Sequence, residues 1–339
     1  MQVQLRDIDL SKVGCRAVVE SFQPKLADYG PETDVFADQG MGFNMGWIWG
    51  HCTTEDGKPH MFARWLGQDE IVTYTWTISS PDLFSAAEVV AAPVPGLEKL
   101  YQGEVRWHLE PDHVAMRSYN PAYTSGIEAT FKPGEIRLID GEHFDLTIHP
   151  VGSSLKFHVP GPPAVMGYTS EIGVPSGTIG GHPIVGGYAG FDRSFGLPGH
   201  SFYRDKLHSI LEEFWIVWGG LDDEGRGQHG HFSTGPGGFC VAIFERDGSE
   251  DIEPISVTAD SFDHFDIDWA THGDAVRPAK ARFAFGGFEF EGTFTGSNLL
   301  PGAEMNMDWV IGSMSVTNRD DIADSTGFCE YFKNLTVIG

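Results

Sequence analysis

Short runs of β-branched and aromatic residues, separated by turn signals, recur along most of the chain. The run at 71–78 (IVTYTWTI) is typical of a strand, and residues 55–58 (EDGK) form a hairpin turn between runs at 46–51 and 60–65. Strands at spacings of about ten residues are typical of an antiparallel barrel or sandwich. No helical stretches alternate with them, so a parallel βαβ architecture is not expected. The pattern predicts an all-β protein with few short helices.

Two segments are the exceptions to the strand pattern. Ser80-Pro81-Asp82 is suited to cap a short helix that ends near residue 92, before Pro93. Apolar residues at i, i+3 and i+4 indicate a helical start within 203–213. Further strands are expected at 105–109, 114–119, 127–131, 135–138, 144–149 and 155–159, and again at 241–246, 255–260, 264–269, 281–285, 288–294, 305–311 and 328–337.

The chain has 339 residues, which favours two domains or one large β unit. The clearest boundary signal is the stretch 160–163 (PGPP). We therefore expect two β domains, at 1–162 and 163–339. A homodimer is one possible oligomeric state, because the sequence contains no feature that decides the oligomeric state.

The charge balance limits the partners. With 22 basic and 48 acidic residues, the formal net charge of −26 opposes nucleic acids and anionic membrane surfaces. The first thirteen residues carry charges without an apolar run, and no stretch approaches the roughly 18 apolar residues that span a bilayer. The four cysteines lack a paired C-x-x-C spacing. These observations predict a cytoplasmic protein with reduced thiols and no membrane insertion.

The stretch 186–196 (GGYAGFDRSFG) is the first candidate for chemistry. Asp192 stands there among aromatic residues and glycines, and a carboxyl that loses hydration against rings has a raised pKa. Such a carboxyl can serve as a general acid near neutral pH. The alternative is structural: Asp192 caps a turn, or pairs with Arg193 or Arg204.

Histidines form the second candidate group. His229 and His231 alternate on an expected strand, so both side chains project to one face. With His51 or a carboxylate they would make a metal site, but no third ligand stands at a diagnostic spacing. We favour histidines that line a pocket or bind a substrate hydroxyl, and we expect no metal.

Tryptophans suggest an apolar ligand. Trp47 and Trp49 share one face of their strand, while Ile48 takes the other. Together with five further tryptophans they offer large apolar surface and indole donors, which suits a hydrophobic or aromatic molecule. These five are Trp65, Trp76, Trp215, Trp218 and Trp309. For any one of them, ordinary core packing is the alternative.

Several enzyme classes lack their defining motifs. The chain has no G-x-S-x-G elbow, no H-E-x-x-H pair and no phosphate loop. A pair of glycosidase carboxylates stays open, since Glu212, Glu213, Asp222 and Asp223 are available. The alternative is that these four are solvent-exposed charges at the ends of strands.

The motifs resemble those of the carotenoid 1,2-hydratase and AttH-like family. Four segments show the resemblance: 176–179 (SGTI), 186–196, 214–218 (FWIVW) and 327–331 (GFCEY). The segment 186–196 corresponds to the family's G-x-x-x-x-D-H-x-W-G pattern, and 327–331 corresponds to its G-x-x-E-Y pattern. Arg193 stands where the family has histidine, and Phe195 where it has tryptophan.

The resemblance implies two lipocalin-like β-barrels with a cavity between them and no organic cofactor. The family includes hydratases of carotenoids and isoflavonoids and is similar in fold to fungal cyclases. The resemblance implies that the family's catalytic acid corresponds to Asp192. Residues implied to orient the substrate or stabilise a developing charge are Tyr188, Arg193, Trp215, Trp218 and His231.

These observations lead to one functional hypothesis with two alternatives. The hypothesis is a cofactor-independent lyase or hydratase, in which Asp192 protonates a double bond or a leaving oxygen of an isoprenoid or aromatic molecule. Aromatic rings would shield the cation that forms. An isomerase or cyclase in the same cavity, and a carrier that leaves its ligand unchanged, are the alternatives.

Overall fold

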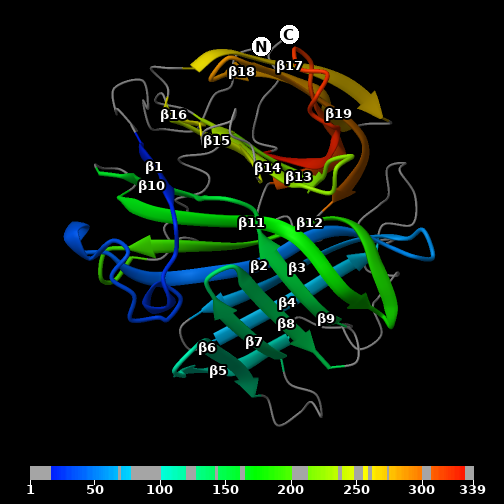
Figure 1. Ribbon diagram of the computed structural model, residues 1–339. Coiled ribbons are helices and arrows are strands. Elements are labelled where there is room, and N and C mark those ends of the chain that lie inside the picture. The colour runs from blue at the N-terminus through cyan, green and yellow to red at the C-terminus, as the bar shows by residue number, and fades with distance from the viewer. Residues whose placement is uncertain are drawn as a thin grey trace.

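In the computed structural model the described residues are 17–67, 70–77, 101–119, 127–141, 144–160, 165–200, 213–235, 239–247, 255–258, 262–272, 275–299 and 307–332. They form two antiparallel sheets and two short 3-10 helices, η2 (Leu26–Asp28) and η3 (Ala37–Gln39). The helices expected at 82–92 and 203–213 lie outside the described residues, apart from Glu213. The described part confirms the all-β prediction, with two curled antiparallel sheets (Figure 1).

The first sheet has twelve strands in the order β1-β10-β11-β12-β2-β3-β4-β5-β6-β7-β8-β9. The hairpin expected around residues 55–58 is present, between β2 and β3. The strands are β1 (Val18–Phe22), β2 (Gly42–Thr54), β3 (Pro59–Gly67), β4 (Glu70–Thr77), β5 (Tyr101–Leu109), β6 (Val114–Tyr119), β7 (Ile127–Lys132), β8 (Glu135–Asp140), β9 (Phe144–Pro150), β10 (Ser154–Val159), β11 (Met166–Ile179) and β12 (His182–Gly196).

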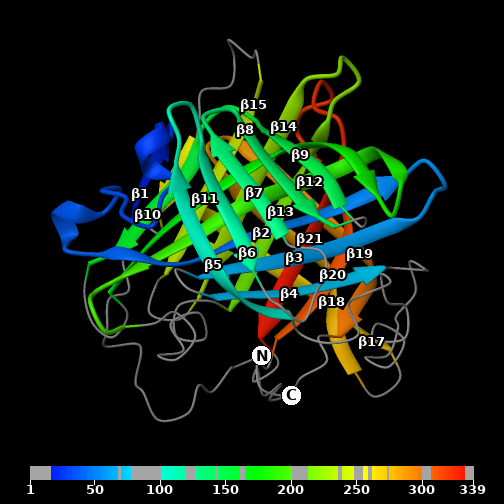
Figure 2. The ribbon, with the colours of Figure 1, turned by 90° about the horizontal axis from the view of Figure 1, so that it is seen from below.

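Strand β11 closes this sheet on itself. One of its edges pairs with β12, while the other pairs first with β10 and then, from Gly173 to Ile179, with β9. Gly177 allows the second contact: it has φ +111°, and an added Cβ would lie 2.0 Å from the backbone oxygen of Asp145. Figure 2 shows the curved wall that results.

The second sheet has nine strands in the order β16-β15-β14-β13-β21-β20-β19-β18-β17. Neighbours pair antiparallel throughout, and β13 with β14 repeats the hairpin pattern of β2 with β3. The strands are β13 (Phe214–Leu221), β14 (Gly227–Thr234), β15 (Cys240–Arg246), β16 (Ile255–Thr258), β17 (Phe262–His272), β18 (Ala275–Phe285), β19 (Phe288–Leu299), β20 (Met307–Val316) and β21 (Ser325–Phe332).

The division between the sheets does not coincide with the boundary expected at residue 162. Strands β11 and β12 follow the 160–163 signal, yet they belong to the first sheet, and the second sheet begins at Phe214. The stretch 186–196, which falls in the expected second domain, therefore lies in the first sheet. It is part of β12, which pairs with β2 from Ile184 to Gly196.

The largest apolar clusters of the described residues lie inside each sheet and between the two sheets. One cluster fills the first sheet and includes Phe131 and Phe191, and another fills the second sheet and includes Phe283. The third lies between the sheets and joins side chains such as Trp49 from β2 and Trp215 from β13. Figure 1 shows β11 and β12 running beneath β13 and β14 at this junction.

A polar contact fixes one end of the junction. In the turn between β9 and β10, the Ser153 N–H donates to Glu245 on β15 over 2.7 Å, and the Gly152 N–H donates to Asp247 over 3.1 Å. The ring nitrogen Nε2 of His229 lies 3.2 Å from the Ser153 carbonyl oxygen. Buried polar groups of the two sheets therefore form hydrogen bonds with one another at this end of the junction.

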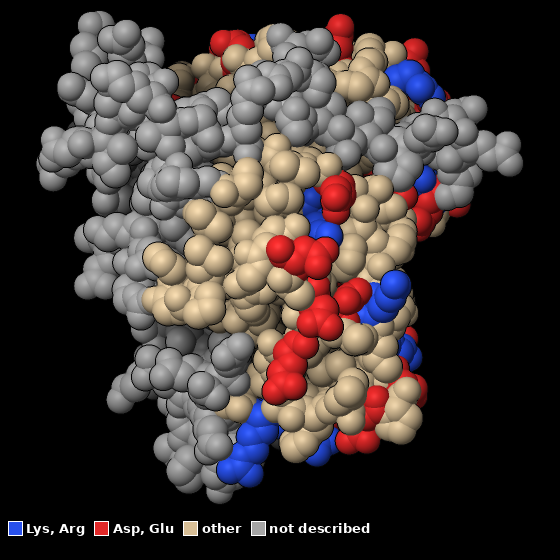
Figure 3. All heavy atoms as spheres, turned by 90° about the vertical axis from the view of Figure 1, so that its left-hand side faces the viewer, with Lys and Arg blue, Asp and Glu red and all other residues tan. Residues whose placement is uncertain are grey.

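The surface agrees with the acidic composition. On the face drawn in Figure 3, acidic side chains form a band with fewer basic ones beside it. The described residues contain no helix with the length and apolarity needed to cross a bilayer.

Candidate functional site

Alternation along β12 decides which side chains reach the junction. Tyr188 belongs to the cluster between the sheets, whereas Ala189 and Phe191 belong to the core of the first sheet. Successive strand residues point to opposite faces. Asp192 therefore shares the junction face with Tyr188, and Arg193 points into the first sheet.

The neighbouring strands place a row of side chains beside Asp192. In the sheet register, Asp192 is opposite Trp47 on β2 and opposite Ser170 on β11. One step along, Gly190 is opposite Trp49, and an added Cβ at Gly190 would lie 3.0 Å from the Trp49 ring. Gly190 thus leaves room for the indole to lie across β12, next to Asp192.

The Asp192 carboxyl is almost fully buried, with 5% of the residue exposed. The Tyr168 hydroxyl donates to Oδ2 over 2.9 Å, and Oδ1 has no hydrogen-bond partner among the described residues. Burial raises the pKa of Asp192 to about 7, although Ser170, Tyr168 and Trp49 lower it by hydrogen bonding to the charged form. The Ser170 hydroxyl and the Trp49 indole are close enough for this effect but lack regular hydrogen-bond geometry.

The second sheet presents another carboxyl to the same junction. Glu330 on β21 is opposite Trp215 on β13 and Trp309 on β20. The Trp309 indole donates to its Oε2 over 2.5 Å. Burial raises the pKa of Glu330 to about 7; the Trp309 hydrogen bond lowers it and the charge of Asp192 raises it.

Aromatic contacts connect the two surfaces around the carboxyls. The Tyr168 ring stacks on Trp47 with centroids 6.1 Å apart and meets Trp215 edge-on at 5.2 Å. On the other side of Asp192, Trp49 meets Phe328 of the second sheet at 5.4 Å. Three of the predicted tryptophans, Trp47, Trp49 and Trp215, are thus brought together at this junction.

The predicted histidines also lie at the junction. His229 and His231 share a face of β14, as alternation predicted, and His231 lies 3.9 Å from Trp215 between ring centroids. Both nitrogens of His231 and Nδ1 of His51 are buried without a partner among the described residues. Burial lowers the pKa of His51 and of His229 to about 4, and that of His231 well below its usual value. All three are neutral at pH 7.

Tyr188 lies at the junction but has a structural contact. Its hydroxyl donates to the Val217 carbonyl oxygen of the second sheet over 3.3 Å. Its ring meets Trp49 edge-on at 5.7 Å. Because burial raises its pKa well above 10, Tyr188 is protonated throughout the physiological range.

Arg193, predicted as a catalytic residue, lies elsewhere. Its fully buried guanidinium pairs with Glu171 at 3.2 Å, donates to the Asp28 carbonyl oxygen and lies over the Tyr29 ring at 5.2 Å. These partners are inside the first sheet, on the opposite side of β12 from Asp192. The structural alternative that Arg193 holds Asp192 ionised is therefore wrong, and so is a direct role for Arg193 at the junction.

Trp218, predicted to bind substrate, is also a core residue. It belongs to the interior of the second sheet, where its ring lies 5.1 Å from that of Phe290. An added Cβ at Gly230 would fall 1.9 Å from the Trp218 ring. The alternation that brings Trp215 to the junction turns Trp218 away from it.

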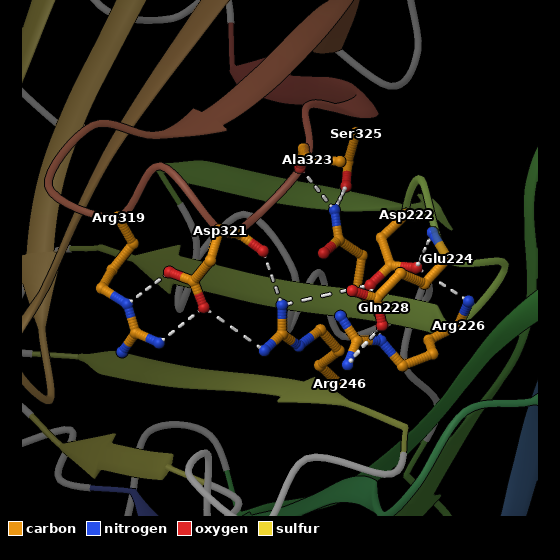
Figure 4. Close-up of polar contacts among 9 residues, drawn as sticks. All are labelled: Asp222, Glu224, Arg226, Gln228, Arg246, Arg319, Asp321, Ala323 and Ser325. Atoms are coloured by element: carbon orange, nitrogen blue, oxygen red, sulfur yellow. Dashed lines mark hydrogen bonds and ion pairs between the residues drawn. The ribbon is translucent and has the colours of Figure 1, made fainter.

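Of the carboxylates considered for a glycosidase pair, Glu212 lies outside the described residues, and Glu213 and Asp222 lie at opposite ends of β13. Asp222 is a buried turn residue that accepts the backbone N–H of Glu224 and of Arg226 and the Arg226 Nε–H over 2.8 Å. Figure 4 shows it in a polar network, with Arg246 and Arg319 meeting at Asp321, that ties the β13–β14 turn to the β20–β21 turn. In the described part of the chain, no three His, Cys, Asp or Glu side chains are grouped to hold a metal ion.

Three site residues were not among the predictions: Tyr168, Ser170 and Glu330. Tyr168 and Ser170 lie on β11, a strand that the sequence analysis did not assign. Glu330 had a visible signal, because it is a single charge within the apolar run 328–332 (FCEYF). Charges in such runs are paired or functional more often than surface charges are.

Several solved structures match this chain, and three of them are named here. The chain is similar to an AttH protein of Nitrosomonas europaea (14% identity, TM-score 0.46, 93% of this chain and 97% of that one), to CghA with Sch210972 (11%, 0.46, 93% and 98%), and to kievitone hydratase of Nectria haematococca (11%, 0.38, 92% and 97%). No family model and no curated protein sequence matches. An AttH protein and a hydratase are among the neighbours, as the motifs led us to expect. At these values the likeness carries no conclusion about activity.

Proposed function

We propose that the protein is a lyase of the hydratase type, with Asp192 as the general acid. The supporting observation is a buried carboxyl whose pKa is raised to about 7 by burial and whose Oδ1 has no partner among the described residues. A group with a pKa near the working pH is both protonated often enough and acidic enough to transfer a proton. The Tyr168 hydroxyl holds Oδ2, which leaves Oδ1 to carry that proton.

The surrounding side chains favour an apolar substrate with a double bond. Proton transfer from Asp192 to one alkene carbon leaves a cation on the other, and the faces of Trp47, Trp49 and Trp215 can stabilise positive charge. Addition of water completes a hydration, and the reverse sequence is a dehydration. The neutral His51 and His231 have ring nitrogens that no described residue binds, and these nitrogens suit a substrate hydroxyl or carbonyl. No step in this scheme requires an organic cofactor or a metal.

The test is a product analysis. The purified protein is incubated with a panel of linear isoprenoid alkenes, prenylated aromatic compounds and their hydrated alcohols, and products are separated by mass spectrometry. We expect gain or loss of one water by the wild type and loss of that activity in Asp192→Asn. A folded Asp192→Asn protein with full activity would refute the proposal.

The alternatives give distinct results in the same assay. A product of unchanged mass and altered retention indicates an isomerase or cyclase. A ligand that binds, quenches tryptophan fluorescence and is recovered unaltered indicates a carrier. Either result would replace the hydratase proposal.

A further inference from the structure

The two sheets present matching rows of side chains to each other. In the first sheet, Asp192 stands beside Trp47, which is opposite it on β2. In the second sheet, Glu330 stands between Trp309 and Trp215. Tyr168 joins the rows, since its hydroxyl donates to Asp192 and its ring meets Trp215 at 5.2 Å. Each sheet thus contributes one carboxyl, flanked by indole, to a shared apolar junction.

Glu330 has features that a structural carboxylate lacks. No arginine or lysine of the described residues pairs with it, and its hydrogen-bond partner there is the indole N–H of Trp309 at 2.5 Å. Buried carboxylates that serve stability alone are usually paired with a cation, as Glu171 is with Arg193. The charge of Asp192 also acts on Glu330, which places the two carboxyls within electrostatic reach of one another.

We infer that Glu330 is the second reacting carboxyl of the site, the base that takes a proton from the water adding to the substrate. This inference rests on the proposed function of Asp192. In hydration, the Asp192 O–H bond breaks and its proton forms a C–H bond with the alkene electron pair. Water then bonds to the cationic carbon and gives one proton to Glu330. Transfer of that proton from Glu330 to Asp192 restores the starting state.

The pair explains how one carboxyl holds a proton while the other lacks it. Two like charges in a desolvated site do not both ionise readily, so the pair shares one proton near neutral pH and titrates in two macroscopic steps. Asp192 is the more deeply buried, whereas Glu330 is partly exposed and bound by an indole donor. The acid role of Asp192 requires this proton to reside mainly on Asp192. Other titratable groups around the pair are Tyr168, Glu171, Tyr188, His231 and Cys329.

Carboxyl titration tests the pair without a substrate. The protein is labelled with ¹³C at the side-chain carboxyls of Asp and Glu, and the Asp192 signal, assigned by its loss in Asp192→Asn, is followed by NMR from pH 4 to pH 9. We expect Glu330→Gln to lower the Asp192 midpoint by about one pH unit, because a neighbouring negative charge is removed. Glu291→Gln, which removes the same charge elsewhere in the second sheet, is the matched control and leaves the midpoint in place.

A second variant keeps the Glu330 carboxyl. Trp309→Phe removes the indole N–H that stabilises its ionised form. The Glu330 midpoint then rises and the Asp192 midpoint falls. If the Asp192 midpoint stays unchanged in both Glu330→Gln and Trp309→Phe, the inference is overturned.

Turnover separates the inference from the proposed function. With an alkene of the panel that the wild type hydrates, Glu330→Gln should lower kcat by about 10²–10⁴-fold. It should retain exchange of solvent deuterium into the alkene, because Asp192 still performs the protonation. Unchanged kcat in Glu330→Gln refutes the base while Asp192 stands. Full activity in Asp192→Asn refutes the proposed function. The carboxyl pair survives that result if Glu330→Gln still shifts the Asp192 midpoint of the otherwise wild-type protein.

Discussion

Asp192 should make the protein less stable as the pH rises, and Asp192→Asn should remove that loss. The folded protein holds the Asp192 proton up to about pH 7, whereas an unfolded chain loses it near the ordinary value of 3.8. The contribution of Asp192 to the free energy of unfolding is therefore fully present below about pH 4, and it is lost as the pH rises from about 4 through 7. At about 1.4 kcal/mol per pH unit, the difference is about 4 kcal/mol for a residue that is 5% exposed.

The measurement is urea unfolding, followed by tryptophan fluorescence, at pH 5, 6, 7 and 8. Relative to their difference below pH 4, the unfolding free energies of wild type and Asp192→Asn should diverge by about 2 kcal/mol at pH 5 and by about 3 kcal/mol at pH 6. At pH 8 the variant should be more stable by up to about 4 kcal/mol. An amide keeps the acceptor for the Tyr168 hydroxyl, so the variant retains that hydrogen bond.

Asp145→Asn is the matched control, because Asp145 is an exposed carboxyl paired with Arg137 on the same sheet. Its unfolding free energy should follow that of the wild type within about 0.5 kcal/mol at every pH. Parallel curves for wild type and Asp192→Asn would refute the argument, since they would show that Asp192 ionises as easily in the folded protein as in the unfolded chain.

Three further substitutions test individual contacts. Gly230→Ala places a Cβ 1.9 Å from the Trp218 ring and should cost about 3 kcal/mol or more, seen as a lower urea midpoint. Arg193→Met leaves Glu171 without its cation and should cost about 3–5 kcal/mol, seen as a lower urea midpoint. Glu245→Ala removes the acceptor of a backbone N–H in the β9–β10 turn and should cost about 1–3 kcal/mol, with faster exchange of that amide hydrogen.

Much of the fold follows from local sequence signals. The β2–β3 hairpin and the strands from β6 to β10 lie within a few residues of the predicted ranges, because each is an alternating run closed by a turn. Strand β11 was missed because its second half, 175–178 (PSGT), has the composition of a turn. That composition serves the close approach of β9 at Gly177, which is a contact made at long range.

The boundary shows a similar limit of local reasoning. The 160–163 signal does fall between two strands, but a connection within one sheet and a connection between two sheets have the same local composition. Strand pairing distinguishes the two cases, and β12 pairs with β2, which lies far away in the sequence. The sequence signal therefore fell between two strands and left the sheet membership of the strands after it undetermined.

For the site, the sequence supplied residue types and faces, while the structure supplied partners. Alternation placed Trp47 and Trp49 on one face and His229 and His231 on another, and both placements hold. The same rule, applied from Asp192, would have turned Arg193 to the opposite side of the strand.

Glu330 could not be placed from the sequence, because its meaning depends on Asp192 across the junction of two sheets. A charge within an apolar strand costs free energy unless a partner or a function compensates it. For Arg193 the compensation is Glu171, within the same sheet. For Glu330 the described partner is a neutral indole, so a charge remains that the fold alone does not require. Asp192 and Glu330, one from each sheet, are therefore the residues whose protonation would show most directly whether the junction is a site of chemistry.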